Sequence, residues 1–130
     1  MRYLLDTHVW LWMAAAPERL GPQAAEIISD PEIRLLLSAA SSWEIAIKSR
    51  LGRLELPEPA ESYVPDRMRI LGVVDLQIDQ AHALAVAPLP LHHRDPFDRM
   101  LIAQARVEGI PVITADAAFD NYDVTLVHAR

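Results

Sequence analysis

Four acidic residues stand where their carboxylates could together hold a divalent cation. Asp6 and Asp116 each follow a short apolar run, and Glu44 and Asp98 lie near the start of segments with helical spacing of apolar residues. If the runs are parallel strands, all four acids reach the edge of the sheet where open α/β sheets bind ligands. Carboxylates gathered there repel one another unless Mg²⁺ or Mn²⁺ lies between them.

Each of these acids also has a purely structural interpretation, which for Asp98 is that of the third residue of a helix capped by Asp95. Asp6 or Asp116 could close an Asx turn at the end of a strand. Glu44 could complete a capping box with Ser41 or pair with Lys48, four residues further on. The convergence of four acids at one edge, rather than any single acid, favours the metal site.

The segment before the long C-terminal helix is also polar. Asp95 is expected to cap this helix, with Pro96 as its first residue and Asp98 in its first turn. Asp95 is therefore either a cap or a ligand, and the cap is favoured. His92 and His93 are given no ligand role, because adjacent histidines cannot easily hold one ion together.

Five apolar runs alternate with helical segments along the chain. Strands are expected at residues 3–5, 35–37, 73–76, 110–114 and 124–127, and helices at 9–16, 22–28, 41–51, 66–71, 79–87 and 96–108. The proline-rich residues 56–65 are expected to form a surface loop. This alternation predicts one three-layered α/β domain over residues 1–130, with a parallel sheet covered on both faces.

Composition narrows the functional classes. The chain has 130 residues, of which 52% are hydrophobic and 23% charged, and this balance is ordinary for one globular domain. The absence of cysteine excludes disulfides, thiolate metal sites and a cysteine nucleophile. A net charge of −6 argues against a basic nucleic-acid footprint but suits ions held by carboxylates. The N-terminal residues lack the apolar run of a secretion signal, and no stretch is long enough for a membrane span, so a cytoplasmic location is expected.

Basic and aromatic residues near the acids are further candidates for contacts with a nucleic acid. Five basic residues could hold phosphates, although a solvated surface is the commoner place for each: Lys48, Arg50, Arg53, Arg94 and Arg99. Trp12 could stack on a base, whereas the apolar surroundings of Trp10 and Trp43 favour core or subunit contacts. The four scattered glycines cannot form a phosphate-binding loop, and no Gly-x-Ser-x-Gly elbow is present.

Four segments, residues 3–12, 37–48, 93–105 and 112–116, follow one another over nearly the whole chain. They read YLLDTHVWLW, LSAASSWEIAIK, HRDPFDRMLIAQA and VITAD. Together they resemble the PIN domain family, and within it the VapC-type toxins of bacterial toxin–antitoxin pairs.

The resemblance implies a ribonuclease with a five-stranded parallel sheet that cleaves RNA with Mg²⁺ or Mn²⁺. Asp6 and Asp98 would contact the metal, Glu44 would hold a second ion or the attacking water, and Asp116 would orient the ligands with help from Thr114. In-line attack by water would leave 5′-phosphate and 3′-hydroxyl ends.

The resemblance also implies protein partners. A homodimer would join two clefts into a longer RNA groove, and a small antitoxin would block the site, often with an arginine that the acidic charge attracts. Two alternatives stay open: a PIN nuclease that processes RNA without acting as a toxin, and a catalytically silent interaction module. The four intact acids argue against the silent module.

Overall fold

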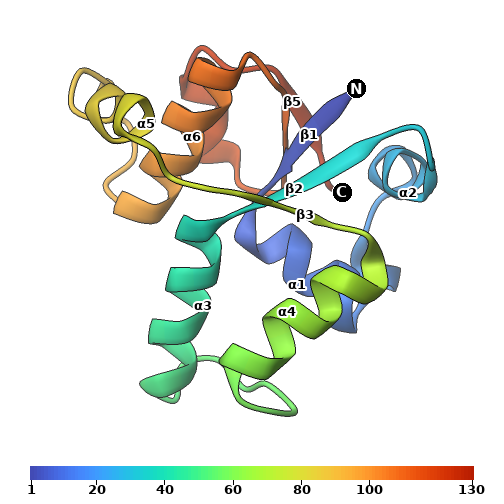
Figure 1. Ribbon diagram of the computed structural model, residues 1–130. Helices are drawn as coiled ribbons and strands as arrows, with labels where there is room; N and C mark the ends of the chain where they lie inside the picture. The colour runs from blue at the N-terminus through green and yellow to red at the C-terminus, as the bar shows by residue number, and fades with distance from the viewer.

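The computed structural model describes residues 1–130, and its centre is a parallel sheet with the strand order β3-β2-β1-β4-β5 (Figure 1). The five strands are β1 (Arg2–Leu5), β2 (Arg34–Ser38), β3 (Val74–Leu76), β4 (Val112–Thr114) and β5 (Leu126–His128). In the register of the sheet, Leu4 of β1 lies opposite Leu36 on one side and Val112 on the other. The predicted α/β class is confirmed.

Helices cover both faces of the sheet (Figure 1). They are α1 (Thr7–Ala15), α2 (Pro22–Ser29), α3 (Ala39–Arg50), α4 (Ala60–Leu71), α5 (Gln80–Ala85) and α6 (Pro96–Glu108), with short 3₁₀ turns η1 (Pro17–Arg19) and η2 (Ala117–Asn121). Residues of α1, α2 and α4 share one apolar core, and residues of α6 belong to the other. None of these helices combines the length and the apolar character that crossing a membrane requires.

The strands alternate their side chains between the two cores. Leu5 and Ile113 face the core with α1, whereas Leu4 and Val112 face the core with α6, and all four are fully buried. Burial of one such side chain contributes roughly 2 kcal/mol. Strand β1 therefore packs against a core on each face of the sheet. This packing also fixes the position of Asp6, the next residue in the chain.

The predicted capping box at the start of the third helix is wrong. Helix α3 follows β2 directly, so its cap is Ser38, the last residue of the strand, whose hydroxyl accepts a backbone N–H of the first turn. Ser41 instead accepts a hydrogen bond from the Thr7 hydroxyl at 2.8 Å. The predicted ion pair between Glu44 and Lys48 is confirmed, since Lys48 Nζ lies 2.6 Å from the Glu44 carboxylate.

The surface loop predicted for residues 56–65 is only partly correct. Helix α4 begins at Ala60 and contains Pro65, whose missing N–H argued against a helix there. Tyr63 and Val64 are buried on the inner side of this helix. Their burial contributes roughly 2 kcal/mol each and offsets the cost of about 3 kcal/mol for a proline inside a helix.

The three tryptophans have different surroundings. Trp10 is fully buried, as predicted, and Trp12 is nearly so. Trp43 is 61% exposed, which contradicts the core position suggested for it and leaves the subunit contact as its remaining interpretation. Its ring lies edge-on to Phe97, with 5.3 Å between the ring centres. Sequence alone could not show this, because α3 turns other residues, such as Ile45, toward the core.

Candidate metal centre

The four predicted acids meet at the carboxyl edge of the sheet. Asp6 follows β1, Asp116 lies two residues beyond β4, Glu44 is in α3, and Asp98 is in the first turn of α6. The charges of Asp6, Glu44 and Asp116 all act on the carboxyl group of Asp98. The sheet edge where β1 and β4 adjoin therefore carries a cluster of carboxylates, as the sequence predicts.

Both oxygens of Asp6 are fixed by hydrogen bonds. Oδ1 accepts the backbone N–H of Thr7 at 2.7 Å, which makes Asp6 the N-cap of α1, and Oδ2 accepts the Thr114 hydroxyl at 2.7 Å. The Thr114 oxygen in turn accepts the backbone N–H of Asp116 at 2.9 Å. Thr114 thus links the two acids, so the orienting role proposed for it toward Asp116 extends to Asp6.

The cluster is short of positive charge. Burial raises the pKa of Asp6, although the hydrogen bond from Thr114 opposes this shift. Burial, followed by the charges of Asp6 and Asp95, raises the pKa of Asp98 to about 8. Glu44 is 3% exposed, and its Oε1 is buried without a hydrogen-bond partner, while Lys48 occupies Oε2.

This donor set fits Mg²⁺ or Mn²⁺, which prefer carboxylate oxygens. A cation at this position would compensate the charges that raise the pKa of Asp98. The unpartnered Oε1 of Glu44 leaves an acceptor for a second ion or a water molecule.

The sequence interpretation missed the part that His93 takes in the cluster. Its Nε2 lies 2.8 Å from Oδ2 of Asp98 and 3.3 Å from Oδ2 of Asp116. Its Nδ1 accepts the backbone N–H of Asp95 at 3.2 Å, so the ring hydrogen is on Nε2 and points to the carboxylates. His93 is therefore placed as a donor that orients the acids. The available signal was its position two residues before the helix cap.

We expect His93→Ala to weaken Mn²⁺ binding by about tenfold, because Asp98 loses the donor that holds its carboxylate in place. His93→Gln should recover most of the affinity, since the glutamine amide can still donate. Calorimetric titration of each variant measures the affinity, and circular dichroism checks the fold. Unchanged Mn²⁺ affinity in His93→Ala would contradict the orienting role.

Other polar candidates have structural partners. Asp95 caps α6, because its Oδ1 accepts the backbone N–H groups of Phe97 at 2.8 Å and Asp98 at 3.3 Å. Arg99 donates to backbone carbonyls of the loop before α6, among them that of Pro90 at 2.9 Å. Asp95 thus serves as the predicted cap, and Arg99 holds the loop rather than a phosphate.

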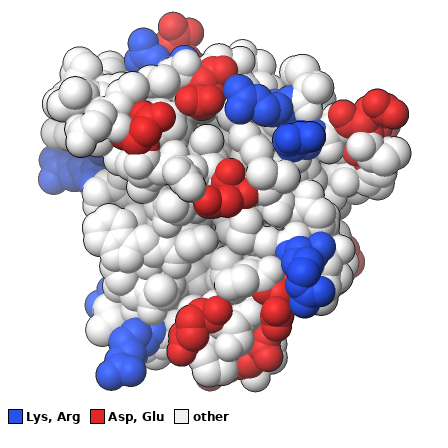
Figure 2. Space-filling view, in the orientation of Figure 1, with Lys and Arg blue, Asp and Glu red and all other residues white.

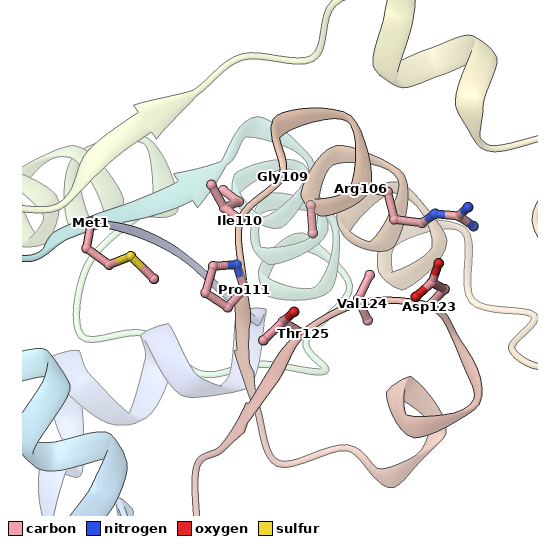
Figure 3. A pocket seen from close by; sticks show the side chains of 9 residues that line it. Met1, Arg106, Gly109, Ile110, Pro111, Asp123, Val124 and Thr125 are labelled. Atoms are coloured by element: carbon pink, nitrogen blue, oxygen red, sulfur yellow. The ribbon is translucent and has the colours of Figure 1, made fainter.

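A cavity of about 510 Å³ lies at the opposite edge of the sheet (Figure 3). Met1, Pro111 and Thr125, which precede β1, β4 and β5, contribute to its walls. Figure 3 shows Arg106 and Asp123 together on one side of it. None of the four predicted acids lines this cavity, so its volume does not mark the candidate site.

The fold and the site together define a class: three-layered α/β domains with a carboxylate centre at the carboxyl edge of a parallel sheet. The chain belongs to the PIN domain family, whose model matches residues 3–124. That range includes all four predicted acids.

Two relatives come from Mycobacterium tuberculosis. The chain is 31% identical to ribonuclease VapC22 over 116 residues. This match covers 87% of this chain and 85% of that protein. It is 59% identical over 56 residues to ribonuclease VapC16, but this match spans only 43% of this chain and 40% of that relative.

Solved structures share the fold. The chain resembles a chain of VapBC2 from Rickettsia felis, bound to a DNA fragment from its promoter, with a TM-score of 0.72 and 12% identity over 98% of both chains. It resembles a chain of VapBC-1 from nontypeable Haemophilus influenzae with a TM-score of 0.66 and 20% identity, covering 98% of this chain and 97% of that one. At these identities the likeness shows the fold alone.

Proposed function

We propose that the protein is a metal-dependent endoribonuclease that acts as the toxin of a toxin–antitoxin pair. The observation that carries the proposal is the cluster of four carboxylates that includes Asp98, whose pKa is raised to about 8. The family match and the two relatives named as ribonucleases support the same activity. An RNA-cleaving toxin would act in the cytoplasm, where its substrate lies.

In the proposed reaction each acid has its own task. Asp6 and Asp98 would hold the ion, since both are largely buried. Bound Mg²⁺ or Mn²⁺ supplies a more acidic water and neutralises charge on the phosphate. Glu44 Oε1 would accept a hydrogen bond from the attacking water, and Asp116 would orient the ligands. Water would displace the 3′ oxygen and leave a 5′-phosphate.

Cleavage of total RNA by the purified protein tests this function. We expect fragments with 5′-phosphate ends when Mg²⁺ or Mn²⁺ is present, and none in EDTA. Cutting that persists in EDTA would exclude the metal mechanism. A preparation that neither cuts RNA nor binds a divalent ion would favour the silent interaction module instead.

The proposal includes an antitoxin that blocks the site, because the solved neighbours include a structure described as a toxin–antitoxin complex. The negative charge of the four carboxylates would attract a basic segment of such a partner. A neighbouring gene for a small DNA-binding protein, and inhibition of RNA cleavage by its product, would separate a toxin from an RNA-processing nuclease.

We also propose a homodimer, formed through the exposed apolar surface around Trp43. This surface includes Phe97, Met100 and Ile78 and encloses a groove of about 290 Å³ between α3, α5 and α6. Figure 2 shows a broad uncharged area on this side of the molecule. Two copies with net charge −6 would meet there with the least repulsion.

Light scattering tests the dimer. The wild type should give twice the mass of one chain, and Trp43→Glu should give the mass of one chain. A monomeric wild type would refute the dimer.

A further inference from the structure

Two arginines gather on one tryptophan at the margin of the metal centre. The guanidinium carbons of Arg19, at the end of η1, and of Arg130 each lie 4.7 Å from the centre of the Trp12 ring. Both arginines are exposed, and neither forms an ion pair with a carboxylate.

A cavity joins one of these cations, Arg130, to the acids. It has a volume of about 240 Å³, and its walls include Asp6 and Asp116 as well as Trp12 and Arg130. An anion held by Arg130 would therefore lie beside the carboxylates that we propose as metal ligands and orienting groups.

Gly21 fixes the position of Arg130. Its backbone N–H donates to the carbonyl of Ala129 at 2.6 Å. A Cβ atom at Gly21 would lie 2.6 Å from the carbonyl carbon of Arg130, a distance that real side chains do not adopt. The end of the chain can lie against the start of α2 only because residue 21 has no side chain.

We propose that Arg19 and Arg130 bind a backbone phosphate of the RNA next to the phosphate that is cleaved. The guanidinium fork matches phosphate oxygens, and stacking on Trp12 orders the two side chains before the RNA arrives. The two cations also offset the repulsion between the acidic cluster and a polyanion. This inference rests on the proposed function and names the site that its substrate would contact.

The test is RNA binding without cleavage. Every protein carries Asp98→Asn, the buffer contains EDTA, and fluorescence anisotropy follows a short labelled single-stranded RNA of mixed sequence over a range of salt concentrations. Arg19→Ala or Arg130→Ala should weaken binding by about tenfold. Each should also reduce the slope of log affinity against log salt by roughly 0.7, the value for one lost phosphate contact on a single strand.

Two further variants separate charge from placement. Arg130→Lys should keep the salt slope but recover only part of the affinity, because lysine keeps the charge and loses the planar stacking. Gly21→Ala should reproduce the loss of Arg130→Ala, because the new Cβ displaces the main chain at residue 130. The matched control is Arg34→Ala, an exposed arginine at the start of β2. Thermal unfolding checks that each variant is folded.

The outcomes distinguish failure of the phosphate site from failure of the proposed ribonuclease activity. Loss of affinity and slope in the Arg19 and Arg130 variants, but not in Arg34→Ala, supports the phosphate site. Unchanged affinity and slope overturn that site and leave the proposed ribonuclease intact. A wild-type protein that binds no RNA in this EDTA buffer at any salt concentration, and cuts none when Mg²⁺ replaces the EDTA, overturns the phosphate site and the proposed function together.

Discussion

Replacing Asp98 with asparagine is expected to stabilise the metal-free protein by roughly 3–5 kcal/mol at neutral pH. Burial and the charges of Asp6 and Asp95 raise the pKa of Asp98 to about 8, from 3.8 for a free side chain. The folded protein therefore binds this proton more tightly than the unfolded chain does. The resulting stability is complete below about pH 4 and is lost as the pH rises through about 8. Asparagine keeps the shape of the Asp98 side chain but has no carboxyl group that can ionise.

Urea unfolding in EDTA at about pH 5 and about pH 8 measures this effect. The wild type should be clearly less stable at the higher pH, whereas Asp98→Asn should change less, with the remaining change due to the raised pKa of Asp6. Asp123→Asn, an exposed acid on the other side of the molecule, is the matched control. If the wild type is equally stable at both pH values, ionisation of Asp98 does not destabilise the folded protein, and the prediction is wrong. Saturating Mn²⁺ should stabilise the wild type and not the variant.

Asp6→Asn is expected to lower the rate of RNA cleavage by about a thousandfold, equivalent to about 4 kcal/mol of lost transition-state stabilisation. Asparagine still caps α1, so the fold is retained. What is lost is one negative charge and one of the two oxygens fixed by Thr7 and Thr114.

The measurement is the initial rate of cleavage of one RNA in Mn²⁺, with Asp123→Asn as the matched control. Thermal unfolding of Asp6→Asn should show a cooperative transition like that of the wild type. If Asp6→Asn cuts as fast as the wild type, the activity belongs to a contaminating nuclease or to another part of the surface, and the metal centre loses its support.

The features that sequence predicted well are those fixed by burial. The apolar runs of the inner strands β2, β1 and β4 became strands because a sheet covered on both faces needs apolar side chains in both directions, as Leu4 and Leu5 illustrate. The edge strands β3 and β5 are less buried. The four acids could be placed together because parallel strands bring their carboxyl ends to one edge. Asp95 was recognisable as a cap from the proline that follows it.

The features that sequence did not predict depend on contacts between distant segments. Helix α4 contains Pro65 because tertiary burial outweighs its local cost. The orientation of His93 depends on Asp116, which lies 23 residues further on. Arg130 reaches Trp12 only because the last strand ends beside Gly21. No local pattern carries that information.

The hydrogen bond between Asp6 and Thr114 also bears on biosynthesis. The two residues are 108 positions apart, and β4 must pair with β1 before the hydroxyl of Thr114 reaches the carboxylate. A ribosome that has made the first hundred residues has therefore made a chain in which this centre does not yet exist. The centre can form only after residue 114 has been synthesised and β4 has paired with β1, and until then the Asp6 carboxylate lacks the hydroxyl that fixes its Oδ2.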